Sequence, residues 1–185
     1  MVLILAADQI SKIVIAANPS KYADLEIIPG FFYISYVKNT GAAWSMMSGQ
    51  RILLCLIAIA AIAGMTVFLL KAKRENNRLT VYALTLMIAG AAGNLIDRLY
   101  LGYVRDFLHF YPLGYDFPVF NIADVSLCIG VGLLIFSTMI EDDEVKKKTD
   151  PDAPLRAIPE KELQEKMIVM EPEVIEPKKD RTGVD

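Results

Sequence analysis

The chain has 185 residues, of which 54% are hydrophobic and 22% charged, and its formal net charge is −3. The apolar content excludes a fully disordered chain, the charge balance argues against nucleic acid as a partner, and two cysteines cannot form a disulfide scaffold. The charge is unevenly divided: residues 1–140 hold 8 acidic and 10 basic side chains, and residues 141–185 hold 14 and 9. We therefore treat the chain as a body, 1–140, and a tail, 141–185.

The first expected element is an apolar helix over residues 1–17, which carries Asp8, Gln9 and Lys12. It lacks the basic start and the unbroken apolar stretch of a secretory signal peptide, so we expect a short first membrane span. Asp8 and Lys12 are four residues apart and therefore share a helix face, where they can form an ion pair.

The next segment is rich in residues that favour β-strands. Residues 31–37 read FFYISYV, and Pro29 and Gly30 precede them. Aromatic and β-branched residues favour a strand, and aromatic side chains suit a membrane interface. We expect a small β-sheet over about residues 26–48, lying as a cradle on the outer face of the membrane.

Three long apolar runs follow, over residues 52–70, 79–96 and 122–140, each 18 or 19 residues long. About 20 apolar residues are needed to cross a bilayer as a helix. Together with the first helix, these runs predict an α-helical integral membrane protein with four transmembrane helices. The connection at residues 71–78 holds four basic side chains and should be cytoplasmic, which places both termini in the cytoplasm.

The tail, 141–185, contains five of the nine prolines and no aromatic residue. A segment that is about half charged cannot bury enough apolar surface to offset the entropy of ordering. We expect a disordered, acidic, cytoplasmic tail.

The predicted topology brings the unusual polar side chains of the body to the outer ends of the spans. They are Asp8 and Lys12 in the first span, Asn94, Asp97 and Arg98 at the end of the third, Asn121 and Asp124 at the start of the fourth, and Asp106 between the last two. Charged groups at membrane depth are costly and are candidates for function. Structural ion pairs, helix caps and interhelical hydrogen bonds remain alternatives for most of them.

Asp106 and Asp124 are the two for which a functional role is favoured. Two neighbouring carboxyl groups do not both ionise readily, so one can accept a proton from water while the other donates one. This is aspartic-protease chemistry and needs no metal or other cofactor. A site with several histidine ligands is excluded, because His109 is the only histidine.

Five ordered segments give the chain a recognisable pattern. They are DQISK at residues 8–12, NTGAAWS at 39–45, GNLIDR at 93–98, VRDF at 104–107 and FPVFNIAD at 117–124. In this order, on a pattern of four spans, the body resembles lipoprotein signal peptidase (signal peptidase II), the bacterial family of intramembrane aspartyl proteases.

The resemblance implies a function and a set of roles. It implies removal of signal peptides from prolipoproteins that carry diacylglycerol on a cysteine, with cleavage just before that cysteine, in the bacterial inner membrane near its outer face. Asp106 and Asp124 would be the catalytic pair. Six residues would support the pair or the substrate: Asp8, Lys12, Asn39, Asn94, Arg98 and Asn121. Gln9, Gly41 and Asp97 are motif positions of less certain role.

Two other classes of function remain open from the residues alone. A small proton-coupled transporter or channel subunit would use intramembrane carboxylates as a relay, and a noncatalytic scaffold would leave the polar set unexplained. The expected partners are the lipid-modified precursors and membrane lipid, and a monomer suffices for the chemistry.

Overall fold

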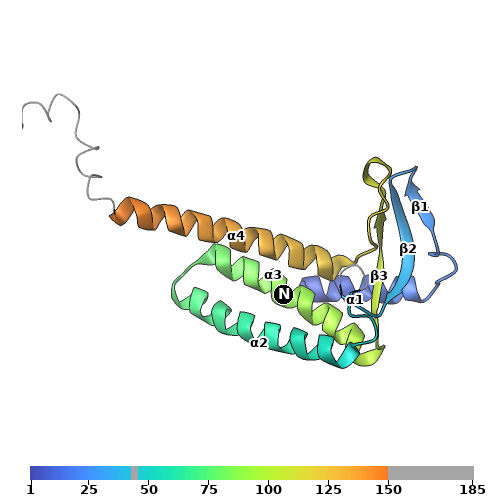
Figure 1. Ribbon diagram of the computed structural model, residues 1–185, viewed down its shortest axis with the longest axis horizontal. Helices are drawn as coiled ribbons and strands as arrows, with labels where there is room; N and C mark the ends of the chain where they lie inside the picture. The colour runs from blue at the N-terminus through green and yellow to red at the C-terminus, as the bar shows by residue number, and fades with distance from the viewer. Residues whose placement is uncertain (43–45, 150–185) are drawn as a thin grey trace, which may run out of the picture. The chain divides into compact units, whose positions relative to one another are not determined.

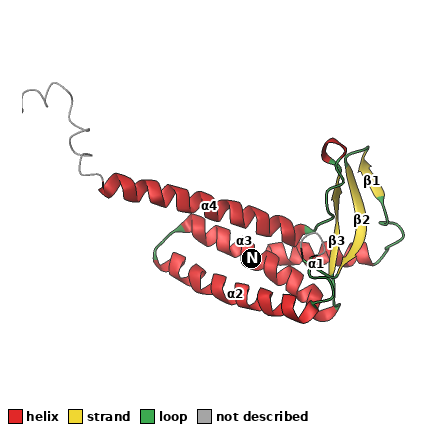
Figure 2. Cartoon of the chain, viewed as in Figure 1, coloured by secondary structure: helices red, strands yellow, loops and turns green. Residues whose placement is uncertain are grey.

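The computed structural model describes residues 1–42 and 46–149, and the side chains of these as far as Ile140. The chain divides into two units, residues 1–139 and 140–185. The described part of the first unit contains three long helices and one shorter helix, with a sheet at one end of them (Figures 1 and 2). This unit contains every residue that the sequence pointed to as functional.

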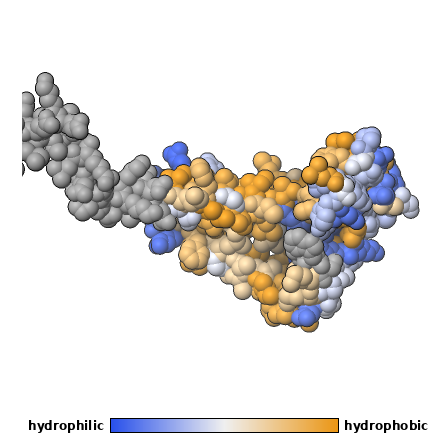
Figure 3. All heavy atoms as spheres, turned by 45° about the horizontal axis from the view of Figure 1, so that its top comes forward, coloured by the Kyte–Doolittle hydropathy of each residue, from blue (hydrophilic) through white to orange (hydrophobic). Residues whose placement is uncertain are grey.

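Among the residues that the structure describes, three helices are long and apolar enough to cross a membrane: α2 (Arg51–Arg74), α3 (Arg78–Tyr100) and the Ile122–Ile140 part of α4 (Ile122–Thr149). Large hydrophobic side chains along α2, such as Ile52, Val67 and Phe68, are exposed. Hydrophobic side chains cover the helices in Figure 3, whereas hydrophilic ones gather on the sheet. Lipid contact explains an apolar surface of this kind on the helices.

The fourth expected span is not found at full length. Helix α1 (Val2–Ala16) has 15 residues, and a helix of that length is about 22 Å long, less than the roughly 30 Å of a hydrocarbon core. It nonetheless exposes Leu3, Ile10 and Ile13 on one side and buries Asp8 and Lys12 on the other. Helix α1 therefore presents an apolar surface outward and a charged surface to the rest of the unit.

Helices α3 and α4 approach each other closely because glycine lies at their contacts. A Cβ atom on Gly90 would collide with the carbonyl oxygen of Ala123, and one on Gly130 would collide with the side chain of Met87. Small residues at such crossings allow two helix backbones to pack directly. The contact at Gly90 fixes the first turn of α4, in which Asp124 lies.

The sheet has three antiparallel strands in the order β1 (Leu25–Ile28), β2 (Phe32–Asn39) and β3 (Val104–Phe110). Its first two strands agree to within one residue with the predicted cradle, about 26–48, but the third comes from the segment between the last two spans, where no strand was predicted. Residues 43–45 of the predicted cradle lie outside the described residues. The third strand could not be read locally, because its partners are about 70 residues earlier in the chain.

Strand β2 contains a bulge where it faces the candidate site. Ile34 pairs with Leu108, and the next pair is Val37 with Asp106, so β2 has one more residue than β3 between these pairs. An extra residue interrupts the ladder and increases the local twist. The pairing around Asp106 is therefore irregular.

Helix α4 continues past the predicted boundary at residue 140 and ends at Thr149. The sequence EDDEVKKK places acidic residues four positions before lysines, a spacing that favours a helix. The first nine residues of the predicted disordered tail are thus helical, and its remainder, from residue 150, lies outside the described residues.

Candidate active site

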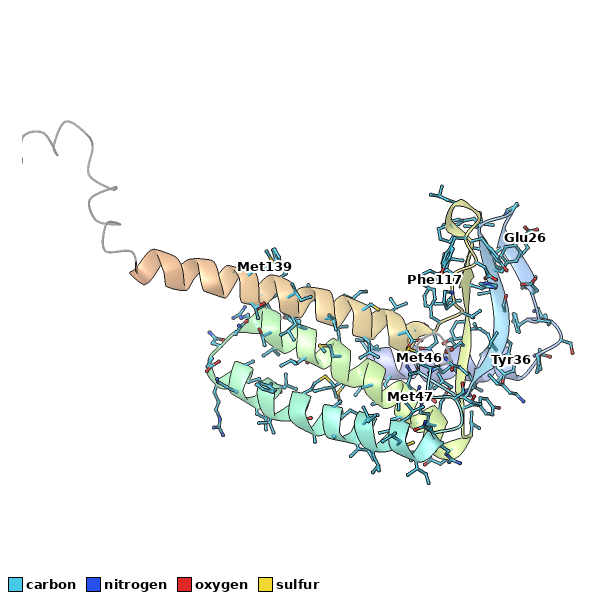
Figure 4. All side chains as sticks on the ribbon, viewed as in Figure 1. Glu26, Tyr36, Met46, Met47, Phe117 and Met139 are labelled. Carbon is cyan, nitrogen blue, oxygen red and sulfur yellow. The ribbon has the colours of Figure 1, made fainter. Side chains whose placement is uncertain are left out.

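The two candidate aspartates line one cavity of about 500 Å³ beside the sheet. Asp106 comes from β3 and Asp124 from the first turn of α4. The cavity wall is otherwise mostly apolar and includes Val104, Phe117, Val125, Leu127, Cys128 and Ile129. Phe117 lies between the sheet and the beginning of α4 (Figure 4). The cavity thus combines two acidic groups with a surface suited to an apolar ligand.

Asp106 is buried and receives two hydrogen bonds from asparagine amides. Asn39 Nδ2 donates to its Oδ2 at 2.9 Å, and Asn121 Nδ2 donates to its Oδ1 at 2.6 Å. The amide of Asn39 is itself oriented by the backbone N–H of Gly41, which donates to Asn39 Oδ1 at 2.9 Å. These contacts fix the direction in which the carboxyl group of Asp106 points.

The pKa of Asp106 is raised from 3.8 to about 6. Burial is the main cause, and the negative charge of Asp124 adds to it, while the hydrogen bonds from Asn39 and Asn121 act in the opposite direction. A carboxyl group with this pKa exchanges its proton near neutral pH. It can therefore serve in general acid–base chemistry without further change.

Asp124 is held by contacts at the helix start. Asn94 Nδ2 donates to its Oδ1 at 2.7 Å, and the backbone N–H of Asn121 donates to its Oδ2 at 3.1 Å. Asn121 also bridges to Asn94, donating to its Oδ1 at 3.2 Å. The amides of Asn94 and Asn121 thereby connect the two aspartates through a continuous chain of hydrogen bonds.

The predicted ion pair between Asp8 and Lys12 is present. Lys12 Nζ lies 2.9 Å from Asp8 Oδ2 and 3.6 Å from Asp97 Oδ2, and all three side chains are almost completely buried. Lys12 Nζ also donates to Asn94 Oδ1 at 2.9 Å, and the backbone N–H of Ala123 donates to Asp8 Oδ1 at 3.0 Å. The charged side of α1 therefore supports both α3 and the start of α4.

Arg98 and Gly41 meet at the edge of the cavity. Arg98 Nη2 donates to the carbonyl oxygen of Gly41 at 2.8 Å, and the Nε atom of Arg98 is buried without a hydrogen-bond partner among the described residues. Gln9 lies between α1 and α3. Its Nε2 donates to Asp8 Oδ2 at 3.0 Å and to the carbonyl oxygen of Gly93 at 3.1 Å. The structure thus brings all eleven predicted residues into one connected region.

Sequence reasoning missed Arg105, which pairs with Asp97 and is described further below. It also gave no role to Asp116 or His109. His109 is in β3, where its ring lies 3.0 Å from Ser35 Oγ and 2.7 Å from Asp116 Oδ1. Because side chains alternate along a strand, His109 faces away from the side of Asp106.

Metal ligation finds no support in the part of the chain that the structure describes, where no three His, Cys, Asp or Glu side chains are arranged to hold a metal ion. Two carboxyl groups that line one cavity can exchange protons with a ligand bound there.

Comparison with known proteins decides the family. The family model described as signal peptidase (SPase) II matches residues 1–140. The chain belongs to the signal peptidase II family. The resemblance drawn from the five motifs is thereby confirmed, and the match covers the body that the sequence delimited.

Named relatives of signal peptidase II agree with this assignment. The lipoprotein signal peptidase of Bacillus subtilis is 43% identical over 146 residues, covering 79% of this chain and 94% of the relative. The lipoprotein signal peptidase of Staphylococcus aureus is 39% identical over 147 residues, covering 80% and 90%. A solved bacterial membrane enzyme is similar in fold, with a TM-score of 0.72 and 38% identity, covering 80% of this chain and 90% of its own.

Proposed function

We propose that this protein is an aspartic endopeptidase that removes signal peptides from diacylglyceryl-modified prolipoproteins by cleaving just before the lipid-modified cysteine. The relatives named as lipoprotein signal peptidases supply the substrate class. The observation that carries the proposal is that Asp106 and Asp124 line one cavity and are connected through Asn94 and Asn121.

The proposed reaction uses one protonated and one ionised aspartate. The ionised carboxylate takes a proton from a water molecule, whose oxygen attacks the scissile carbonyl carbon, while the protonated carboxyl group donates a hydrogen bond to the carbonyl oxygen. The tetrahedral intermediate then loses its C–N bond, and the leaving amine takes a proton from the pair. Neither a covalent enzyme intermediate nor a cofactor is required.

The remaining polar residues have supporting roles in this proposal. Asn39, Asn94 and Asn121 orient the two carboxyl groups through the hydrogen bonds described above. Asp8 and Lys12 hold Asn94 and the start of α4 in place, with Gln9 and Asp97 beside them. Arg98 borders the cavity, so its guanidinium is suited to bind a substrate carbonyl oxygen.

The proposed membrane placement rests on the apolar helices and on the positive-inside rule. The sheet lies at the outer interface, α1 enters the membrane as a short fourth span, and the basic turn between α2 and α3 faces the cytoplasm with both termini. Leu127, Cys128 and Ile129 form an apolar wall one turn beyond Asp124, against which the acyl chains of the substrate can lie. The enzyme acts as a monomer in the bacterial inner membrane.

Cleavage of purified precursor tests the proposal. Asp106→Asn and Asp124→Asn should each lower kcat/KM by at least about 100-fold, because each removes a group that transfers protons. The precursor with diacylglycerol should be cut, and the same precursor without lipid should not. Undiminished cleavage by either variant, or equal cleavage of both precursors, would reject the proposal. Proton flux through proteoliposomes that depends on these aspartates would favour a transporter instead.

A further inference from the structure

Arg105 immediately precedes Asp106 on β3, and its side chain is fixed by one buried carboxylate. Its guanidinium donates to both oxygens of Asp97, from Nη2 to Oδ1 at 2.6 Å and from Nε to Oδ2 at 3.1 Å. The backbone N–H of Arg105 donates to Asp97 Oδ2 at 2.9 Å. The side chain and the main chain of Arg105 are therefore both bound to Asp97, near the end of α3.

The partner of Arg105 is itself held in place. Asp97 is completely buried and lies 3.6 Å from Lys12 Nζ. Gln9 contributes to the same cluster, because its Oε1 accepts a hydrogen bond from Arg105 Nη2 at 3.1 Å and its Nε2 donates to Asp97 Oδ1 at 3.4 Å. The contact thus connects β3 with both α1 and α3, the elements that carry the rest of the polar network.

The sheet alone holds Asp106 less firmly than a regular ladder would. The bulge of β2 lies directly before the pair Val37 and Asp106. Neighbouring side chains on a strand point to opposite faces, so the direction of Arg105 determines that of Asp106. An arginine bound toward α3 requires the following carboxyl group to point the other way, toward Asn39 and Asn121.

We propose that Arg105 is a positioning residue of the peptidase: by binding Asp97 it fixes the direction and the register of β3, and thereby places the Asp106 carboxyl group opposite Asp124. Arg105 acts through Asp106 and not on the substrate, since it is absent from the residues that line the cavity. The inference rests on the proposed function, because it takes Asp106 as a catalytic group.

The geometry of the contact defines the variants. A guanidinium binds two carboxylate oxygens at once, whereas a lysine ammonium keeps the charge without the planar fork. Arg105→Gln removes the charge and the fork, and Arg105→Lys removes only the fork. Arg51→Gln is a matched control, because Arg51 Nη2 donates to the carbonyl oxygen of Leu99 at 2.6 Å and lies outside the cavity.

The test uses full-length purified protein and the lipid-modified precursor, with kcat, KM, the pH profile and the thermal midpoint measured for each variant. We expect Arg105→Gln to lower kcat by about 10- to 100-fold per folded molecule, because a catalytic group is misplaced, and to change KM by less than about twofold. The pH-rate limb that belongs to Asp106 should move to higher pH, because the carboxylate loses donors that lower its pKa. Arg105→Lys should restore part of kcat, and Arg51→Gln should equal the wild type.

A double variant shows whether Arg105 works through Asp97. Asp97→Asn combined with Arg105→Gln should lower kcat by clearly less than the product of the two single effects, because both changes remove the contact between these two side chains. An Arg105→Gln protein with wild-type kcat and pH profile would overturn the proposal, as would a change confined to KM or to the thermal midpoint. If that variant does not fold, wild-type kcat in Arg105→Lys overturns it. An active Asp106→Asn variant would instead reject the proposed function.

Discussion

Asn121 and Asp124 cap each other at the first turn of α4. The backbone N–H of Asp124 donates to Asn121 Oδ1 at 3.1 Å, and the backbone N–H of Asn121 donates to Asp124 Oδ2 at the same distance. This reciprocal pair is a capping box, in which an aspartate takes the place of the usual glutamate or glutamine. The carboxylate that we propose for catalysis therefore also begins its own helix.

Substitutions in this capping pair should affect catalytic activity and stability differently. Asp124→Asn keeps an oxygen that accepts the Asn121 N–H, so it should lose activity with little change in stability. Asn121→Ala removes the cap and should lower the free energy of unfolding by about 0.5–2 kcal/mol, together with activity. Thermal unfolding and precursor cleavage, measured on the same preparations, distinguish the two. Equal losses of stability in both variants would contradict the capping role.

The raised pKa of Asp106 predicts a pH-dependent stability. The carboxyl group has a pKa of about 6 in the folded protein and about 3.8 when unfolded, so between these values the folded state binds more protons. Stability therefore falls as pH rises through this window, by at most about 3 kcal/mol. Asp106→Asn should abolish this dependence. The check is the difference in thermal midpoint between wild type and variant, measured from pH 4 to pH 7; a constant difference would contradict the prediction.

The hydrogen bond from Asn39 to Asp106 should influence the pH at which activity changes. It lowers the pKa of Asp106 against the effect of burial, so Asn39→Ala should raise that pKa. The limb of the kcat/KM profile that belongs to Asp106, near pH 6 in the wild type, should then move to higher pH. A profile of kcat/KM against pH for both proteins tests this, and a shift to lower pH would show that the limb belongs to another group.

The close approach of α3 and α4 predicts that replacing glycine by alanine lowers activity where the helices touch and has no effect elsewhere. Gly90→Ala should separate the helices at Ala123, displace Asp124 and lower kcat/KM by about tenfold or more. At Gly64 in α2 and Gly132 in α4, an added Cβ atom would meet nothing within 4 Å, so alanine there should leave activity unchanged. Alanine is also the better helix former, and these controls should be as stable as the wild type or more so.

Cysteine chemistry can report on the cavity. Cys128 is exposed and lines the cavity, whereas Cys55 is buried. A maleimide should therefore attach to Cys128 and inhibit cleavage, because the added group occupies space proposed for the substrate. Cys128→Ala should be active and resistant to the reagent. Labelling at Cys128 that leaves cleavage intact would show that the substrate does not use this wall.

Local patterns predicted the parts of the site that depend on local geometry. Three spans followed from apolar length, and the pairing of Asp8 with Lys12 followed from a spacing of four on a helix. Strand β3 was missed because its seven residues, which include Arg105, Asp106 and His109, give little strand signal without their partner β2. The contact of Arg105 with Asp97 was missed for the same reason, since it requires the strand to turn back against α3.

The sheet combines strands from two distant segments, and this has a consequence for synthesis. Asp106 is on the strand that completes the sheet, and Asp124 begins the helix that follows, whereas their supports start with Asp8 in α1. A ribosome must therefore release nearly the whole body before both carboxyl groups can meet. A chain that ends before residue 124 therefore lacks part of the pair that we propose for catalysis, however completely its earlier helices have formed.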